Sequence, residues 1–99
     1  MKSTFLAHLT LPEFFSTQFM SLIPKQRACI NELMDRGVIK SYSLDMARRN
    51  VWVFLEAHDE EDVMDTLESF PIINNVKIRV HELAFYDAAP IGLPELIMN

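Results

Sequence analysis

The sequence predicts an α+β domain whose elements follow one another in the order β-α-β-β-α-β. Two patterns in the apolar residues carry this prediction. Alternation with a period of two marks four strands, at Ser3–Leu11, Val38–Leu44, Val51–Ala57 and Asn75–Phe85. Recurrence every three or four residues marks two helices, at Pro12–Arg36 and Asp59–Phe70. This order is that of the ferredoxin-like fold, with a four-stranded antiparallel sheet and both helices on one face, and residues 1–86 fit it as a single domain.

The first strand alternates Phe5, Ala7 and Leu9 with more polar residues. Pro12 and Glu13 follow it and suit the first turn of a helix, where the missing N–H of proline is not needed and an acid meets the positive end of the dipole. We therefore expect the first helix to begin at Pro12.

An apolar stripe runs along the first helix if Gln26 is skipped. Its members are Phe15, Phe19, Leu22, Ile30 and Leu33. Pro24 falls inside the pattern and removes one backbone hydrogen bond, so we expect a kink there or a short helix that starts again. Gly37 supplies a left-handed residue to end the helix.

The second half of the chain begins with a hairpin, because the polar segment Asp45–Asn50 separates two strands. Asp59 is a good N-cap for the second helix, and the acids after it match the helix dipole. The buried stripe of this helix is Val63, Leu67 and Phe70, and Pro71 ends it. The last strand alternates Val76, Ile78 and Val80 with charged residues.

Composition restricts the classes of partner. Hydrophobic residues make up 49% of the 99-residue chain. Such a content indicates either a well-filled core or apolar surface that meets a second copy of the chain. We favour the second copy, as a homodimer or a larger ring. The net charge of −5 argues against a nucleic-acid surface, which needs clustered cations.

Location and redox chemistry follow from other features. The chain lacks the pattern of a signal peptide, and no apolar run reaches membrane-spanning length, so we expect a cytoplasmic protein without membrane contact. Cys29 is the single cysteine and cannot form an internal disulfide. Its helical position indicates a buried thiol rather than a catalytic one.

The segment 87–99 holds two prolines, one glycine and several large apolar residues. A solvated tail is normally poor in apolar residues. We therefore interpret it as a C-terminal arm that packs on its own or a neighbouring subunit, with simple disorder as the alternative.

Several residues able to carry chemistry share one predicted face of the sheet. In the strand order 4-1-3-2 the alternation points them away from the helices. They are His8, Trp52, Phe54, Glu56, Arg79 and His81. Apolar area with a few proton-transferring groups is typical of a pocket wall, but a subunit interface has the same composition. Both interpretations stay open.

Other candidates are weaker. Tyr42 is a possible hydroxyl donor to a substrate carbonyl, although packing explains a tyrosine in a strand as well. The pair Arg48–Arg49 would bind a carboxylate bidentately, or is plain solvated charge. His81 and Glu82 point apart in a strand, and no metal-ligand spacing occurs, so we expect no metal and no cofactor.

Several segments read together resemble the muconolactone isomerase-like family. They are the strand Phe5–Pro12 ending in Leu-Pro, the run Leu33–Gly37 leading to Ser41–Leu44, the strand Val51–Glu56, Asp65–Leu67 with Ser69–Pro71, and the closing strand around His81–Leu83. The resemblance implies a ferredoxin-like subunit, a dimeric α+β barrel that pairs sheet to sheet and sometimes builds larger rings.

The resemblance also implies an activity. The enzyme that names the family shifts a double bond in an unsaturated lactone, which takes a proton from beside a conjugated carbonyl and returns it elsewhere. No catalytic motif of the family matches this chain, but its own residues offer Glu56, His8 or His81 as the base, with Tyr42 or a histidine donating to the oxygen. Trp52, Phe54 and Arg79 would contact the substrate, a small hydrophobic organic acid or lactone. The alternative is a non-catalytic module for homo-oligomeric association.

Overall fold

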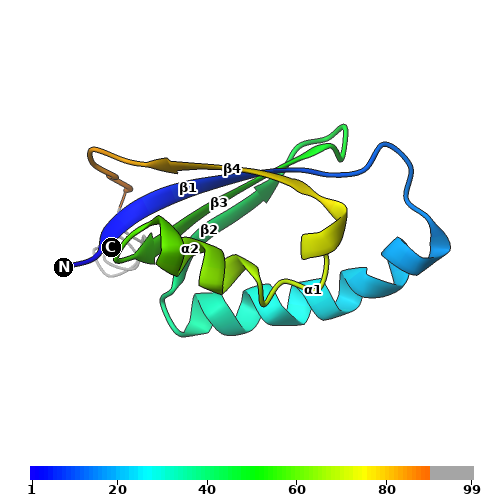
Figure 1. Ribbon diagram of the computed structural model, residues 1–99, viewed down its shortest axis with the longest axis horizontal. Helices are drawn as coiled ribbons and strands as arrows, with labels where there is room; N and C mark the ends of the chain where they lie inside the picture. The colour runs from blue at the N-terminus through cyan, green and yellow to red at the C-terminus, as the bar shows by residue number, and fades with distance from the viewer. Residues whose placement is uncertain (90–99) are drawn as a thin grey trace, which may run out of the picture.

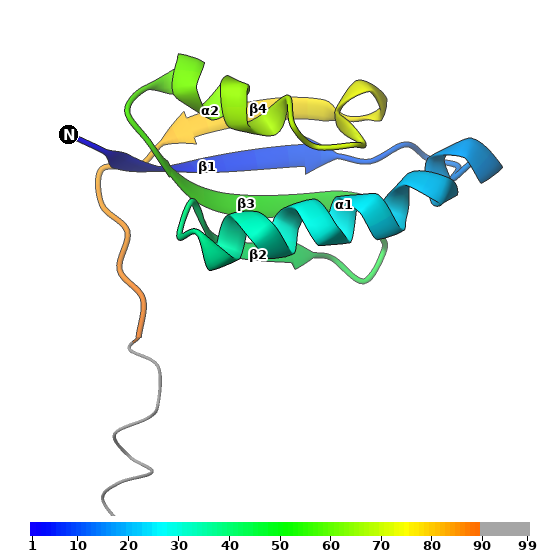
Figure 2. The same cartoon turned by 90° about the horizontal axis from the view of Figure 1, so that it is seen from below.

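The computed structural model describes residues 1–89 and shows the α+β architecture expected (Figure 1). The elements are β1 (Ser3–Thr10), α1 (Thr17–Asp35), β2 (Ile39–Leu44), β3 (Asn50–Ala57), α2 (Glu60–Leu67), the short 3₁₀ helix η1 (Ile73–Asn75) and β4 (Lys77–Glu82). Both α-helices lie against the same face of one sheet, and within residues 1–89 no helix lies on the other face (Figures 1 and 2). This arrangement is consistent with a ferredoxin-like fold.

The four strands are antiparallel and ordered β2-β3-β1-β4, as predicted. In β1 the residues Phe5, Ala7 and Leu9 point toward the helices and are buried. Their neighbours Leu6 and His8 point to the opposite face, which we call the open face, because successive side chains in a strand alternate. The register of the strands therefore determines which side chains are neighbours on each face of the sheet.

The core fills the space between the helices and the sheet. Its largest fully buried side chains are Phe5, Leu9, Ile30, Val53, Leu55, Val63, Leu67 and Phe70. These include all three predicted inward residues of the second helix, Val63, Leu67 and Phe70. Ile78 and Val80 of β4 are half-buried and pack against the same cluster. The inward assignment of the last strand is thus confirmed.

Cys29 packs against the core from α1 and is half-buried, so it is less enclosed than its helical position predicts. Its Sγ lies 3.6 Å from the carbonyl oxygen of Ser69, which follows α2. The thiol therefore contributes to the contact between the two helical segments.

The first helix begins later than predicted, at Thr17 rather than Pro12. Ser16 is the N-cap, and its Oγ accepts a hydrogen bond from the backbone N–H of Phe19 at 3.0 Å. Leu11 N–H instead donates to the carbonyl of Arg49 at 2.8 Å, which keeps the chain beside the sheet as far as that residue. As the N-cap, Ser16 pairs a backbone N–H of the first turn that would otherwise have no partner. Proline has no side-chain acceptor with which to cap a helix.

Pro24 lies inside α1, and the helix is a single element through it rather than two. The proline has no N–H to donate to the carbonyl of Met20. Both residues are exposed, so water can hydrate the freed carbonyl. The restart expected at this position does not occur.

Gly37 ends α1 as predicted, with a φ of +76°. The N–H of Gly37 donates to the carbonyl of Met34, and the N–H of Val38 donates to that of Leu33, each at 3.0 Å. These are the two bonds of a Schellman motif, which requires a left-handed residue after the C-cap.

The chain after β4 turns onto the open face. Leu83 N–H donates to the carbonyl of Thr4 in β1 at 3.1 Å, and the ring of Tyr86 lies 5.2 Å from that of Phe54 in β3. Residues 83–86 therefore cover part of this face. Most of the predicted C-terminal arm, residues 90–99, lies outside the described residues.

Candidate functional site

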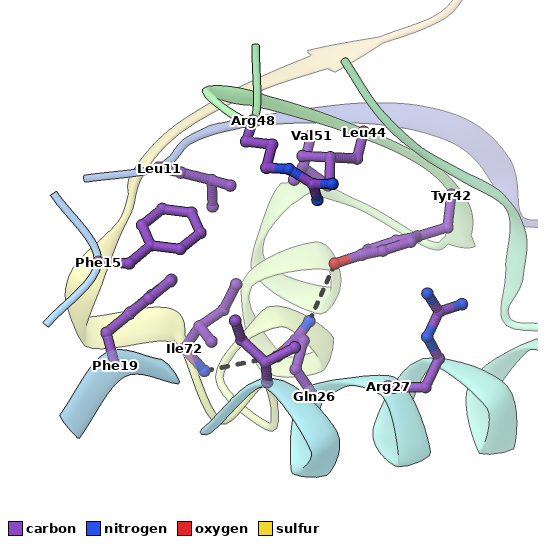
Figure 3. A pocket seen from close by; sticks show the side chains of 11 residues that line it. Leu11, Phe15, Phe19, Gln26, Arg27, Tyr42, Leu44, Arg48, Val51 and Ile72 are labelled. Carbon is purple, nitrogen blue, oxygen red and sulfur yellow. Dashed lines mark hydrogen bonds between the residues drawn. The ribbon is translucent and has the colours of Figure 1, made fainter. Parts of the chain in front are cut away.

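A cavity of about 280 Å³ lies between α1 and the helix-facing side of the sheet (Figure 3). Most of its wall is apolar. The lining residues come from the β1–α1 connection, the N-terminal half of α1, β2, the turn after it, β3 and the segment before η1. They are Leu11, Phe15, Phe19, Ile23, Gln26, Arg27, Tyr42, Leu44, Arg48, Val51 and Ile72. A small apolar cavity with a few convergent polar groups is the usual form of a small-molecule site.

Gln26 is the buried polar residue at the centre of this lining, with 5% of its surface exposed. Its Nε2 lies 3.4 Å from the Tyr42 hydroxyl, and its Oε1 accepts the backbone N–H of Ile72 at 3.4 Å. These bonds are long, but they join α1, β2 and the segment before η1 (Figure 3). In the sequence Gln26 only interrupts the apolar stripe, and it was not predicted as a site residue. Its position four residues before Ile30 places it on the buried face of the helix, and this spacing is the sequence feature that marks it.

Tyr42 presents its hydroxyl to the cavity from β2 (Figure 3). Burial raises the pKa of Tyr42 above its usual value of 10.0, while the hydrogen bond from Gln26 and the charge of Arg27 act in the opposite direction. A phenol with a raised pKa keeps its proton at neutral pH. Tyr42 is therefore a hydrogen-bond donor in this site and not a base.

Arg48 reaches the cavity from the turn between β2 and β3 (Figure 3). Its backbone φ of 59° is positive. This left-handed region is uncommon for a residue with a Cβ. The turn holds the conformation through Asp45, whose backbone carbonyl accepts the Arg48 N–H at 3.0 Å. Asp45 Oδ1 also accepts the N–H groups of Arg49 and Asn50, at 2.9 and 3.0 Å.

The lowered pKa of Asp45 makes the stability of this turn depend on pH. Hydrogen bonds from the Asn50 side chain first, and from the backbone of Asn50 and Arg49, lower the pKa of Asp45 from 3.8 to about 2. Because the folded pKa is the lower one, the stabilisation is complete above about pH 4 and is lost as the pH falls through about 2. Carbon-detected NMR of the Asp45 carboxyl measures this titration. A midpoint at the ordinary value of 3.8 would contradict the hydrogen bonding described.

The residues predicted as catalytic lie on the open face, on the other side of the sheet from the cavity. His8 is opposite Trp52 in β3 and Arg79 in β4. Its ring stacks on that of Trp52, with centroids 5.7 Å apart, and its Nε2 is 2.8 Å from Asn50 Oδ1. Asn50 Nδ2 donates to Asp45 Oδ2. Asn50 Oδ1 is therefore an acceptor, so Nε2 of His8 donates the hydrogen between them.

The other two candidate bases lie in other rows of the open face, His81 in the row next to His8 and Glu56 one row further along β1. Glu56 is opposite Thr4, which is four residues along β1 from His8. Four residues of a strand span about 13 Å. Glu56 pairs instead with Lys40 at 3.4 Å, in a half-exposed ion pair of the kind that contributes little stability. His81 of β4 is exposed and lies opposite Leu6 of β1. Phe54 of β3 lies opposite the same leucine from the other neighbouring strand. Of these candidates, His8, Trp52 and Arg79 form one row.

Tyr42 faces the helices because of an irregularity in β2. Ile39 pairs with Leu55 and Tyr42 pairs with Val53, so a step of three residues in β2 matches a step of two in β3. The register shifts between Ile39 and Ser41, which returns Tyr42 to the same face as Ile39. Tyr42 is thereby separated from the candidate bases on the open face.

Neither a family model nor a curated protein matches this chain. Within residues 1–89 no helix has the length and apolar character needed to cross a membrane. In the same residues no three His, Cys, Asp or Glu side chains are grouped so that they would hold a metal ion. The cytoplasmic location expected from the sequence stays a prediction.

Proposed function

We propose that this chain binds a small, mainly apolar organic acid or lactone in the cavity between α1 and the sheet. The observation that carries the proposal is the composition of the cavity wall. Phe15, Phe19 and Leu11 provide apolar surface, and Tyr42 adds one partly buried hydroxyl. A volume of about 280 Å³ is just below the usual range of small-molecule sites, about 300–1,000 Å³.

Two arginines favour an acidic ligand. Arg27 and Arg48 both line the cavity, and both are exposed. Guanidinium groups bind carboxylates with strong, charge-assisted hydrogen bonds. The ligand class is the one implied by the resemblance to the muconolactone isomerase-like family.

The geometry favours binding over isomerisation. A double-bond shift needs a base beside the ligand. The titratable groups among the lining residues within 1–89 are Arg27, Arg48 and Tyr42, and none of these is a base at neutral pH. His8, Glu56 and His81 lie on the opposite face of the sheet, where they do not line the cavity. Their assignment as the base of an isomerase stays a prediction.

Titration of the labelled protein with trans-cinnamate, an unsaturated acid, and coumarin, an unsaturated lactone, tests the proposal. We expect amide shifts in ¹H–¹⁵N spectra to centre on the lining residues of α1 and β2. Replacing both arginines, Arg27→Gln with Arg48→Gln, should weaken cinnamate binding about fivefold, as expected for exposed charge pairs.

The matched control for this experiment is Arg36→Gln, which removes an exposed charge at the end of α1 away from the cavity lining. Its affinity for cinnamate should equal that of the parent protein. Shifts confined to the open face, or no shifts with either compound, would show that the cavity is not the binding site.

A second function, self-association, is favoured by the open face. Leu6, Trp52 and Phe54 are half-buried there, and both α-helices of residues 1–89 lie on the opposite side of the sheet (Figure 1). An apolar centre with charged residues at its margin, such as Arg79 and Lys77, has the composition of a protein interface. We propose that two copies of the chain pair through this face, which is compatible with ligand binding in the cavity.

A further inference from the structure

We propose that Gln26 is a specificity-determining residue, which directs the Tyr42 hydroxyl proton into the cavity and so selects a ligand that presents a carboxylate oxygen at that point. This inference rests on the proposed function and names the chemical class and the orientation of the ligand. The apolar body of the ligand then lies on the side of the cavity where Figure 3 shows Phe15 and Phe19.

The orientation of the Gln26 amide follows from its partners. The backbone N–H of Ile72 can only donate, so the amide atom that faces it is the oxygen Oε1. The nitrogen Nε2 must then face the Tyr42 hydroxyl and donate to it. Because Gln26 is buried, both of its groups need partners, and this arrangement is the one that satisfies them.

The Tyr42 hydroxyl is therefore an acceptor toward Gln26, and its own proton is free to donate elsewhere. Within residues 1–89 the hydroxyl oxygen makes no hydrogen bond other than the one from Gln26. A ligand atom that meets this hydroxyl must consequently be an acceptor. An ammonium group or another obligate donor would leave two hydrogens facing each other, which is costly in a partly buried site.

Positive charge makes a carboxylate the favoured acceptor. Arg27 is close enough to Tyr42 for its charge to influence the hydroxyl, and Arg48 lines the same cavity from the turn before β3. The opposite part of the wall, around Leu11 and Phe19, is apolar and buried. A charged head at Tyr42 with an apolar body toward Phe19 matches both halves of the cavity.

The experiment compares trans-cinnamate with its methyl ester, which keeps the shape and the carbonyl but removes the charge. The parent protein should bind the acid about tenfold more tightly than the ester. Tyr42→Phe should weaken cinnamate binding about tenfold and ester binding less. Gln26→Glu should weaken cinnamate binding at least as much as Tyr42→Phe does. The new carboxylate accepts the hydrogen bond of the Tyr42 hydroxyl and repels the ligand's carboxylate.

Matched controls separate these effects from general damage. Gln18→Glu makes the same change at an exposed position of α1, and Tyr86→Phe makes the other change on the open face, so both should bind as the parent does. If Gln26→Glu fails to fold in amide spectra, Tyr42→Phe decides alone. Equal affinity for acid and ester, or unchanged binding in the folded variants, would overturn this inference while cavity shifts still supported the proposed function. No binding of either compound would overturn the proposed function itself.

Discussion

Phe70→Ala is expected to lower the free energy of unfolding by about 3–5 kcal/mol. Phe70 follows α2 and is 1% exposed, so the substitution leaves a cavity between the helices and the sheet. For a domain of this size the loss is a large part of a total stability of about 5–15 kcal/mol. It corresponds to a fall in Tm of at least about 12 °C.

The same substitution should also disturb the ligand cavity. The carbonyl of Phe70 accepts the N–H of Ile73 at 3.0 Å, and this bond closes the turn that carries Ile72 to the cavity wall. A looser turn moves the backbone N–H that orients Gln26. Ligand affinity should therefore fall even at temperatures where the variant stays folded.

Urea denaturation followed by circular dichroism measures the change in stability, and Phe14→Ala is its matched control. The side chain of Phe14 is 83% exposed. Its removal should therefore alter the free energy of unfolding by no more than about 0.5 kcal/mol. Similar losses in the two variants would show that Phe70 is not the core residue described.

The order of the elements and the faces of β1, β3 and β4 could be predicted from the sequence, because a half-buried strand repeats every two residues. Phe5, Ala7 and Leu9 are buried, while His8 is on the other face, as the alternation requires. The same pattern correctly placed Trp52 and its neighbours in β3. Local periodicity was sufficient wherever a strand was regular.

The cavity could not be predicted in the same way, since its polar centre depends on contacts distant in sequence. Gln26 bonds to Tyr42, 16 residues away, and to Ile72, 46 residues away. The face of Tyr42 depends on a register shift in β2, and nothing in the local pattern marks the residue at which it occurs. The site therefore required the tertiary structure.

The position of the first helix start shows a competition between two local signals. Pro12 and Glu13 suit a first turn, but Ser16 provides a side-chain cap for Phe19 and determines the start. The intervening residues instead place Phe15 at the cavity. A connection between β1 and α1 that is longer than predicted thus contributes part of the apolar wall.

Phe54→Lys is expected to convert a self-associated protein into a monomer. Phe54 lies on the open face between Leu6 of β1 and Ser41 of β2, where a charge would be buried without a partner when two copies met. Such a change at the centre of an interface raises Kd at least about hundredfold. Sedimentation velocity over a range of protein concentrations measures it.

The control and the folding check use other positions. Met46→Lys places the same charge on a side chain that is 94% exposed at the hairpin turn, and it should associate as the parent does. Because Phe54 also contacts Tyr86, circular dichroism must show that Phe54→Lys is folded, and Leu6→Lys offers a second variant on the same face. A parent protein that sediments as a monomer at every concentration, or folded variants that stay associated, would exclude the open face as the pairing surface. A monomer that still binds cinnamate would show that the cavity of one chain is complete, because the lining residues within 1–89 all lie off the open face.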